Sequence, residues 1–598
     1  MQSSTSGSPQ GKPFPFKGNG IFGGNYSLSF FSDSRMQALS TRLQNSKLDD
    51  LVKRVAEVVS HRLRSSPQSA NGSILVRSND KDIMVNQDTA AIYIKAYFQR
   101  VHPFYPFLDQ TTFEQNIADP DFSRKLSTNK ALSALYHSVL ALGCQHCRNG
   151  SFEPGKSRAW QLFSVALSLF PDLLTLPDSL LTLQALTSMA IFTLSVSCIQ
   201  IEHIIISEGA RRAQQISFGQ LTDGLSDTYG RVFWVLYTIE KTSSFYYGRS
   251  SIFNDSDIGH PVPAISESSF NGFNWFLASA RHARLLSRAY SSLFSIGVTG
   301  NSWEYFGATI DQLYSKLEDW RLSIPEEIRP GTAFWEQSLP GPLMPQVALW
   351  THYLYHSLLL ALARATLHLG SRTAEGTDLN RLVRSKQEIM KASRAILELT
   401  RLVEVEPYTP VWALVGIPVA ALFVLFDLII HNPKHPETGS NLALLHVASG
   451  HFSRIEYASG GSLPGSMVSE FAFIASEYVK NVQQNFGSDN LPETLQRSTL
   501  AANSQNVDYL GASYLPISSP EGQFEMPSAN DIVPTSQTSG PEISGVFDDV
   551  FYPIHDGFYN TQNGSLGGTN LINLFGSAVP GVSFNVDPWN DVGGGWKE

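Results

Sequence analysis

Cysteine is scarce in this sequence, which has three in 598 residues: Cys144, Cys147 and Cys198. So few cysteines, and an odd number of them, exclude a disulfide framework and indicate reduced thiols, as in the cytosol or nucleus. The N-terminus also lacks the apolar run of roughly 7–15 residues that a secretory signal needs. We therefore do not expect this chain to be exported.

Charged residues are few as well, at 16% of the chain. Cations are almost absent from the C-terminal part: from Ala501 to Glu598 there are eleven acidic residues and one cation, Lys597. This segment accounts for the whole net charge of −10, because the first 500 residues hold 42 acids and 42 bases. The distribution excludes a globally basic protein that coats nucleic acid.

Common catalytic motifs are absent, since neither G-x-S-x-G nor H-E-x-x-H occurs. A phosphate-loop pattern, G-x-x-x-x-G-K-[ST], does run from Gly150 to Ser157. A working loop of this kind follows a buried strand, whereas the residues before this one have helical periodicity, and Pro154 removes one amide from the phosphate cradle. We predict a turn between two helices, with Gly150 as the helix stop. Nucleotide binding by this loop is the alternative.

The candidate metal ligands do not form a set. Cys144-Gln-His-Cys147 is a single C-x-x-C, and zinc would need two more ligands at suitable spacing. Cys198 stands alone in an apolar stretch. We predict no catalytic, cofactor-binding or metal-binding residue. Five histidines lie singly among aromatic or apolar residues, where a hydrogen-bonded core or surface histidine is expected: His102, His137, His352, His356 and His368.

Apolar residues recur at intervals of three and four from about residue 89 to residue 486, which is typical of helices. No connection shows the regular alternation of a strand. The sequence predicts an all-α protein: a single large multi-helix domain, residues 89–486, with disordered N- and C-terminal tails at 1–33 and 487–598. The predicted helices are 132–142, 160–170 with a stop at Pro171, 180–206, 229–244, 273–294, 305–322, 347–369, 382–402, 412–430, 442–455 and 468–482.

One stretch, Val411 to Ile430, approaches the ~20 apolar residues that cross a bilayer. Pro418 lies at its middle and Asp427 near its end, and no cluster of Lys or Arg flanks it. We predict a helix that is buried by neighbouring helices. A membrane span is the alternative.

Residues 34–88 combine an amphipathic segment with a polar linker. Between Met36 and Leu63, apolar residues fall on one face of a helix or of two short ones. We interpret this face as packing on the chain's own core. A short dimerising coiled coil is the alternative, although strict heptads are not sustained.

Acidic and aromatic residues alternate in two patches of the C-terminal tail. Acidic neighbours keep aromatic side chains in water, where an apolar coactivator groove can bind them. We predict a candidate activation region in residues 487–598, with an inert solvated tail as the alternative. The aromatic residues expected to make the contacts are Phe547, Phe551, Tyr552, Phe558 and Trp589.

Five short motifs occur in order between residues 93 and 356. Together they resemble the regulatory middle homology domain of fungal zinc-cluster transcription factors, also called the fungal-specific or xylanolytic-activator-type domain. The third motif departs from the family pattern, because Glu240-Lys241 replaces the usual Asp-Arg and Ser250 replaces the usual Pro. The motif residues are His102, Pro103, Pro106, Leu108, Asp109, Thr112 and Phe113; the helix within Ser207 to Gly219, similar to Gly-Ala-x-Arg-x-Ala; Arg231, Trp234, Gly248, Arg249, Asp257, Ile258 and Pro263; Leu317, Trp320, Leu322, Ile324 and Pro325; and Tyr355-His356.

These matches predict architecture rather than a reaction centre. Gly248 is expected to let the chain leave a helix with positive φ. Arg249 is expected to satisfy terminal carbonyls or to pair with Asp257. The resemblance implies an inducible regulator whose helical domain restrains or senses, and whose acidic tail recruits the transcription machinery.

The sequence departs from the family pattern in one way that affects function. Such factors normally begin with a six-cysteine cluster that holds two zinc ions and inserts a helix into the major groove, but this chain has no cysteine before Cys144. Zinc binding is therefore not carried over, and no cofactor is expected. Either the chain is an incomplete or shortened gene product, or DNA contact comes from a partner.

The sequence as a whole predicts a nuclear fungal transcription regulator, not an enzyme, that controls a metabolic or secondary-metabolite gene set. Its expected protein partners are transcription coactivators and a homo- or heterodimer partner that binds through residues 36–63. We expect it to bind DNA only weakly or through a partner, and to respond to a small-molecule inducer. A helical ligand-binding or adaptor protein that does not touch DNA is the alternative. An enzyme that uses the loop from Gly150 to Ser157 is a more distant one.

Overall fold

A computed structural model describes residues 39–64, 85–196, 199–216, 223–247, 249–259, 261–295, 298, 301–332, 339–370 and 379–489. In these residues the secondary structure is helical except for one short antiparallel hairpin, β1 (Ser269–Phe270) and β2 (Phe273–Asn274). The predicted all-α fold class is confirmed. The predicted C-terminal tail begins too early, because residues 487–489 are still part of the last helix, Gly465–Asp489. The rest of the predicted tails, with all five aromatic residues of the candidate activation region, lies outside the described residues.

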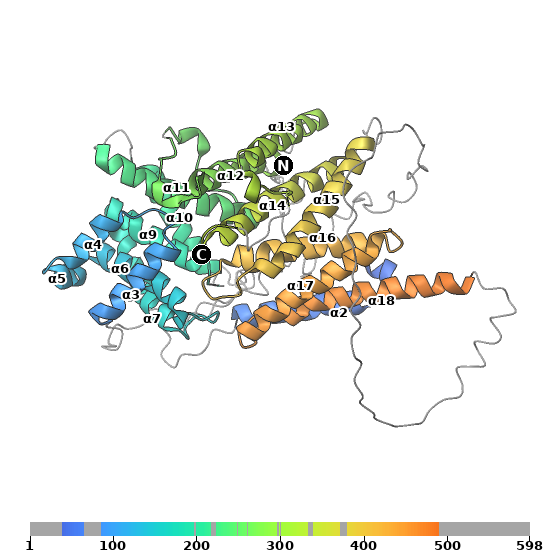
Figure 1. Ribbon diagram of the computed structural model, residues 1–598, viewed down its shortest axis with the longest axis horizontal. Helices are drawn as coiled ribbons and strands as arrows, with labels where there is room; N and C mark the ends of the chain where they lie inside the picture. The colour runs from blue at the N-terminus through green and yellow to red at the C-terminus, as the bar shows by residue number, and fades with distance from the viewer. Residues whose placement is uncertain are drawn as a thin grey trace, which may run out of the picture.

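The first half of the described chain packs around one apolar core, on the left of Figure 1. Its centre is α6, against which α3, α7 and α9 pack, and α10 and α11 complete the layer beside α9. Gly143 on α6 meets the backbone of Tyr93 on α3, where a Cβ would collide with the Tyr93 carbonyl. The helices are α3 (Gln87–Arg100), α4 (Gln110–Ala118), α5 (Phe122–Thr128), α6 (Lys130–Cys144), α7 (Arg158–Ser168), α8 (Phe170–Thr175), α9 (Leu180–Thr193), α10 (Ile199–Gln215) and α11 (Asp223–Tyr247).

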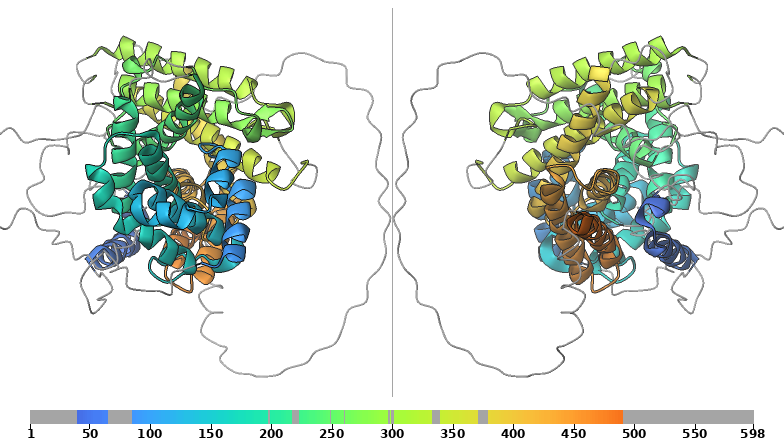
Figure 2. Two further views of the ribbon diagram at one scale, coloured as in Figure 1. Left: turned by 90° about the vertical axis from the view of Figure 1, so that its left-hand side faces the viewer. Right: turned by 90° about the vertical axis from the view of Figure 1, so that its right-hand side faces the viewer.

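The second half forms another apolar core on the right of Figure 1. The helices α14 and α15 pack together, α16 lies against α15, and the pair α17 and α18 covers α16. Figure 2 shows the two halves end-on, with α12 and α13 along the upper edge. The helices are α12 (Trp275–Ala289), α13 (Trp303–Leu322), α14 (Met344–Gly370), α15 (Leu379–Leu399), α16 (Ile417–His431), α17 (Thr438–Ala458) and α18 (Gly465–Asp489).

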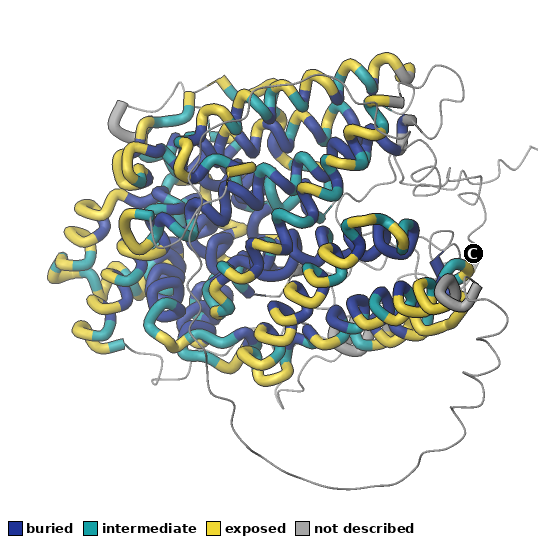
Figure 3. Tube along the Cα trace, turned by 45° about the vertical axis from the view of Figure 1, so that its right-hand side comes forward, coloured by how far each residue is buried: buried dark blue, intermediate teal, exposed yellow. Residues whose placement is uncertain are grey.

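The apolar stretch at residues 411–430 is buried, as the sequence predicted. Buried residues fill the interior of the helical body (Figure 3). By length and composition, Trp412–His431 is the one helix among the described residues that could cross a membrane, yet 89% of its most apolar window is buried inside the protein. The helix is interrupted near its start. Residues Trp412–Gly416 form a π-helical turn, and Pro418 occupies the first turn of α16.

The amphipathic segment packs on the chain's own core. Residues 39–43 form a helical turn, and α2 (Lys47–Arg64) follows along α18 (Figure 1). Leu48, Leu51 and Val55 are buried in this contact, and two salt bridges flank it, Lys47–Glu477 and Arg54–Glu470. A coiled-coil dimer through the same face would require α2 to leave α18.

Two predicted helix boundaries are wrong. The predicted helix 180–206 is two helices, because α9 ends at Thr193 and the carbonyl of Leu194 accepts a hydrogen bond (2.8 Å) from the amide of Val411 instead of continuing the helix. Pro171 was expected to end a helix but lies in the first turn of α8. A proline is tolerated there because the first amides of a helix have no intrahelical acceptor.

Candidate ligand-binding cavity

A cavity lies where the two apolar cores meet. It encloses ≈ 1260 Å³ of empty space, including its opening to solvent. Its walls come from the turn after α3, the end of α9, and the helices α10, α11, α12, α14, α15 and α16. Ligand sites are common at such junctions between packed units, so this cavity is the candidate site.

One wall of the cavity is aromatic. The ring centroid of Trp350 lies 4.7 Å from that of Phe104, 5.8 Å from that of Trp275 and 5.3 Å from that of Trp412. We call these four residues the aromatic wall. They join the turn after α3 to α12, α14 and the π-helical turn, so both halves contribute to the wall. Flat aromatic faces offer a large apolar contact area to a bound molecule.

The π-helical turn that carries Trp412 is fixed by a proline and a histidine. Pro418 has no amide hydrogen, so the carbonyl of Leu414, four residues earlier, lacks its helical donor. The ring Nε2 of His451 on α17 lies 2.7 Å from that carbonyl and donates to it. Burial lowers the pKa of His451 to about 4, which keeps the ring neutral near pH 7. The hydrogen bond from His451 therefore stabilises this irregular turn in the cavity wall.

Glu202 is the acidic residue in the cavity lining. It lies in the first turn of α10, and only 4% of its surface is exposed. Ser243 Oγ donates to Glu202 Oε1 (3.0 Å), and Tyr247 Oη donates to Oε2 (3.5 Å). Burial raises the pKa of Glu202 to about 7, although these hydrogen bonds and the charge of Arg249 act in the opposite direction.

Three other polar side chains in the cavity are paired with protein groups. The ring Nε2 of His282 on α12 donates to the carbonyl of Leu354 on α14 (2.9 Å), and burial lowers the pKa of His282 to about 4. The hydroxyls of Tyr246 on α11 and Ser357 on α14 lie 2.6 Å apart. Each of these bonds joins α14 to α11 or α12. Hydrogen bonds therefore connect helices that line the cavity.

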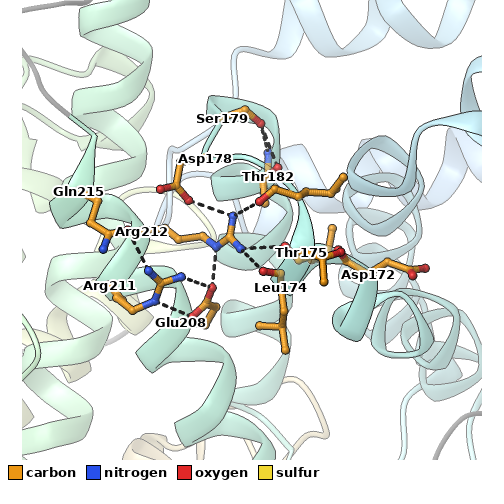
Figure 4. Close-up of polar contacts among 12 residues, drawn as sticks. Asp172, Leu174, Thr175, Asp178, Ser179, Thr182, Glu208, Arg211, Arg212 and Gln215 are labelled. Atoms are coloured by element: carbon orange, nitrogen blue, oxygen red, sulfur yellow. Dashed lines mark hydrogen bonds and ion pairs between the residues drawn. The ribbon is translucent and has the colours of Figure 1, made fainter.

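Arg212 anchors the helix that carries Glu202 (Figure 4). The residue is 2% exposed, and its guanidinium donates to the carbonyls of Leu173 (2.9 Å) and Leu174 (3.0 Å) at the end of α8. It also bonds to Glu208 Oε1 (2.6 Å) and Asp178 Oδ1 (3.0 Å), and the carbonyl of Leu176 is a further acceptor (3.0 Å). The second sequence motif therefore has an architectural role, because Arg212 satisfies carbonyls that the short helix α8 leaves without donors.

The third motif holds the loop after α11. Lys241 Nζ donates to the carbonyl of Phe253 (2.8 Å) and pairs with Asp255 (3.0 Å). Glu240 accepts hydrogen bonds from Ser251 Oγ (2.8 Å) and the amide of Ile252 (2.9 Å). The two residues that depart from the family pattern thus still anchor this loop. The structure places Arg249 over the ring of Tyr247, at 4.9 Å from its centroid, and gives it no ion pair with Asp257, while Gly248 lies outside the described residues.

The phosphate-loop pattern lies in a turn between helices, as predicted. A π-helical turn, Gln145–Asn149, precedes Gly150, and Ser157 caps the start of α7 by accepting from the amide of Trp160 (3.0 Å). Lys156 pairs with Glu153 (2.8 Å). No strand precedes this pattern in the described residues before it.

The cysteines and histidines singled out in the sequence do not converge. Cys144 is buried and Cys147 is partly buried, and burial raises the pKa of both thiols. Among the described residues no group of three or more His, Cys, Asp or Glu side chains could hold a metal ion. His102 is a core histidine whose Nε2 lies 2.7 Å from the carbonyl of Leu108. Cys198 and the side chain of His368 lie outside the described part.

Sequence reasoning missed Glu202 and the aromatic wall. A single acid within the apolar run Ile199 to Ile206 was the available signal, because a carboxylate among apolar residues of a helix is either exposed or functional. The wall had no comparable signal, since its residues lie on four separate segments of the chain.

Comparison with known proteins identifies the class of domain. Residues 94–322 match the family described as "Fungal specific transcription factor domain". This segment is therefore similar to that domain, and the matching relatives are fungal transcription factors. The matched segment includes Glu202 and the other lining residues from Phe104 to His282, whereas Trp350 and Trp412 lie beyond it.

The individual relatives are similar over most of this chain. An ABC-transporter-regulating transcription factor of Aspergillus fumigatus is 24% identical over 451 residues, which cover 69% of this chain and 50% of the relative. A protein of the same description from Aspergillus oryzae is 23% identical, covering 63% and 45%. The Fusaridione A cluster transcription factor of Fusarium heterosporum is 22% identical, covering 62% and 72%. The chain spans about half the length of the two Aspergillus relatives, and no solved structure matches it.

Proposed function

We propose that this protein is a fungal transcription regulator whose helical domain binds a small molecule in the cavity between its two halves. The cavity carries this proposal: it is mostly apolar, lined by both cores, and contains a small number of buried polar groups. The relatives are regulators of ABC transporters and of a secondary-metabolite cluster, which supports control of a metabolic or secondary-metabolite gene set.

The proposal includes a nuclear location and no enzymatic activity. Both are supported by the relatives, which are transcription factors. DNA contact is supplied by a partner or by a part of the protein outside the helical domain. Coactivator binding is assigned to the tail at 487–598, through Phe547, Phe551, Tyr552, Phe558 and Trp589.

Ligand binding is tested with the purified chain and a neutral aromatic probe, 1-naphthylmethanol, by isothermal titration calorimetry. We expect binding by the natural sequence and loss of binding by Ala361→Phe, which adds a ring to the cavity wall. The matched control is Ala443→Phe on an exposed position of α17. Equal binding by Ala361→Phe, shown by circular dichroism to be folded, would place the probe elsewhere and contradict the cavity assignment.

Activation is tested separately by fusing the chain to an unrelated DNA-binding domain that controls a reporter gene. We expect activity that is lost when the five tail aromatics are replaced by Ala. Replacement of neighbouring acids should cost less, because each exposed acid contributes under about 1 kcal/mol whereas a fully buried aromatic contributes about 1.5–3 kcal/mol. A silent fusion would favour the alternative, a ligand-binding or adaptor protein that does not touch DNA.

A further inference from the structure

The buried carboxyl of Glu202 has no salt-bridge partner among the described residues. Among the described residues, no Lys, Arg or His nitrogen lies within the 4.0 Å ion-pair distance of its oxygens, and its hydrogen bonds come from the hydroxyls of Ser243 and Tyr247. Arg249, whose charge favours the ionised form of Glu202, stacks on the ring of Tyr247. An ionised carboxylate in this position is desolvated and has no salt-bridge partner among the described residues.

An unpaired buried charge is costly, and a cation brought by a ligand would remove that cost. The position of Glu202 in the first turn of α10 gives its charge some support from the helix dipole. That support is smaller than an ion pair in a site shielded from water. The site therefore favours a ligand group that is positively charged and can donate a hydrogen bond.

The rest of the lining suits the body of such a ligand. The aromatic wall shares the cavity with Glu202, and it offers the π faces to which ammonium groups and apolar rings both bind. The polar groups of His282, Tyr246 and Ser357 in the lining are bonded to protein partners and carry no charge at neutral pH.

We propose that the cavity selects apolar molecules that carry a protonated amine, with the ammonium group paired to Glu202 and the apolar body against the aromatic wall. This inference rests on the proposed function, that the cavity binds a small molecule. It adds the chemical class of that molecule and the residue that recognises it.

The pH dependence of binding should report the charge of Glu202. The raised pKa, about 7, means that the carboxyl is mostly protonated at pH 6 and mostly ionised at pH 8. On α11, Glu240 and Lys241 are bonded to the loop that follows, and burial holds the pKa of Tyr246 and Tyr247 far above this range. Arg249 stacks on the ring of Tyr247. Burial lowers the pKa of His203, and α9 has no titratable side chain. Glu202 is therefore the group expected to titrate.

The experiment compares two probes that differ in one group, 1-naphthylmethylamine and 1-naphthylmethanol, by calorimetry on the full chain. At pH 8 we expect the amine to bind about tenfold more tightly than the alcohol, a preference that shrinks at pH 6. Amine binding at pH 7 should also release about half a proton, measured in buffers of different ionisation enthalpy. This proton release needs no variant.

Glu202→Gln should bind both probes with the affinity of the alcohol at either pH, whereas the exposed control Glu398→Gln should keep the preference. Equal affinities for the two probes in the natural chain at pH 8, or a preference retained by Glu202→Gln, would overturn the inference while leaving the cavity as a ligand site. Failure of both probes to bind the natural chain would remove the proposed function and this inference together.

Discussion

The hydroxyl of Tyr246 lies 2.6 Å from that of Ser357, which is 111 residues further along the chain. The first belongs to α11 and the second to α14, so this bond joins the first and second halves of the described chain across the boundary beside the cavity. The bond between Leu194 and Val411 crosses the same boundary. The two halves are thus joined by specific polar contacts as well as by apolar packing.

Replacing Tyr246 by Phe should lower the free energy of unfolding by about 1 kcal/mol, because one buried hydrogen bond is lost and Ser357 loses a partner. Denaturant unfolding followed by circular dichroism measures this change. The control is Tyr457→Phe, since Tyr457 is 91% exposed and its variant should be neutral. An effect of equal size in both variants would show that the contact does not contribute.

Replacing Arg212 by Lys should destabilise the protein by about 3–5 kcal/mol. Lysine keeps the charge but cannot reproduce a planar fork that reaches the carbonyls of α8 and two carboxylates, so buried acceptors are left without donors. The neighbouring Arg211 is largely exposed, and Arg211→Lys should cost under about 1 kcal/mol. Thermal and denaturant unfolding compare the two, and equal losses would contradict the anchoring role.

Stability should fall as the pH drops below about 6.5. Burial lowers the pKa of His282, His352 and His451 to about 4 and that of His356 to about 3. The unfolded chain therefore binds protons on these rings from about pH 6.5 downward, while the folded chain does not. Each ring then lowers the free energy of unfolding by about 1.4 kcal/mol per pH unit until the pH reaches the pKa of that ring in the folded chain. Unfolding measured between pH 7 and pH 5 checks this.

Replacing one buried histidine isolates its contribution to the pH dependence of the free energy of unfolding. His451→Gln keeps a donor near the carbonyl of Leu414 but cannot titrate, so its free energy of unfolding should depend less on pH, by one proton, than that of the natural chain. A pH dependence identical to that of the natural protein would show that His451 is not a buried neutral ring.

Glu202 should affect the pH dependence of stability in the opposite direction from the buried histidines. Its folded pKa, about 7, lies above the ordinary value of 4.5, so the folded chain binds more protons than the unfolded chain between these values, and the contribution of Glu202 to stability falls as the pH rises. Glu202→Gln should therefore become more stable than the natural chain as the pH rises from 5 to 8, by up to about 3 kcal/mol. The exposed control Glu398→Gln should show no such trend, and a constant difference for Glu202→Gln would contradict the raised pKa.

The sequence predicted the long helices well and their breaks less well. The helices α13 to α18 lie close to the predicted ranges because their apolar spacing is sustained over many turns. The break between α9 and α10 was missed because apolar residues continue through Leu194 and Val196, and the hydrogen bond of Leu194 at the break goes to the distant amide of Val411. The hairpin β1–β2 was missed because each strand has two residues, too few for an alternating pattern.

The cavity could not be predicted in the same way. A motif search finds residues that are close in sequence, whereas Glu202, Trp275, Trp350 and Trp412 meet only after the two cores have packed together. The aromatic residues have the spacing of ordinary core positions. Whether such a residue fills the interior or lines an opening depends on the helices around it.

The contact between α2 and α18 also affects how the protein is made. The ion pair between Lys47 and Glu477 joins residues 430 positions apart, so α2 leaves the ribosome long before its partner exists. During synthesis the apolar side chains Leu48, Leu51 and Val55 have no covering helix, and an exposed apolar face of this kind is a binding site for chaperones and a source of aggregation. Nascent chains that stop before Gly465 should therefore be retained by chaperones, and release should follow the completion of α18.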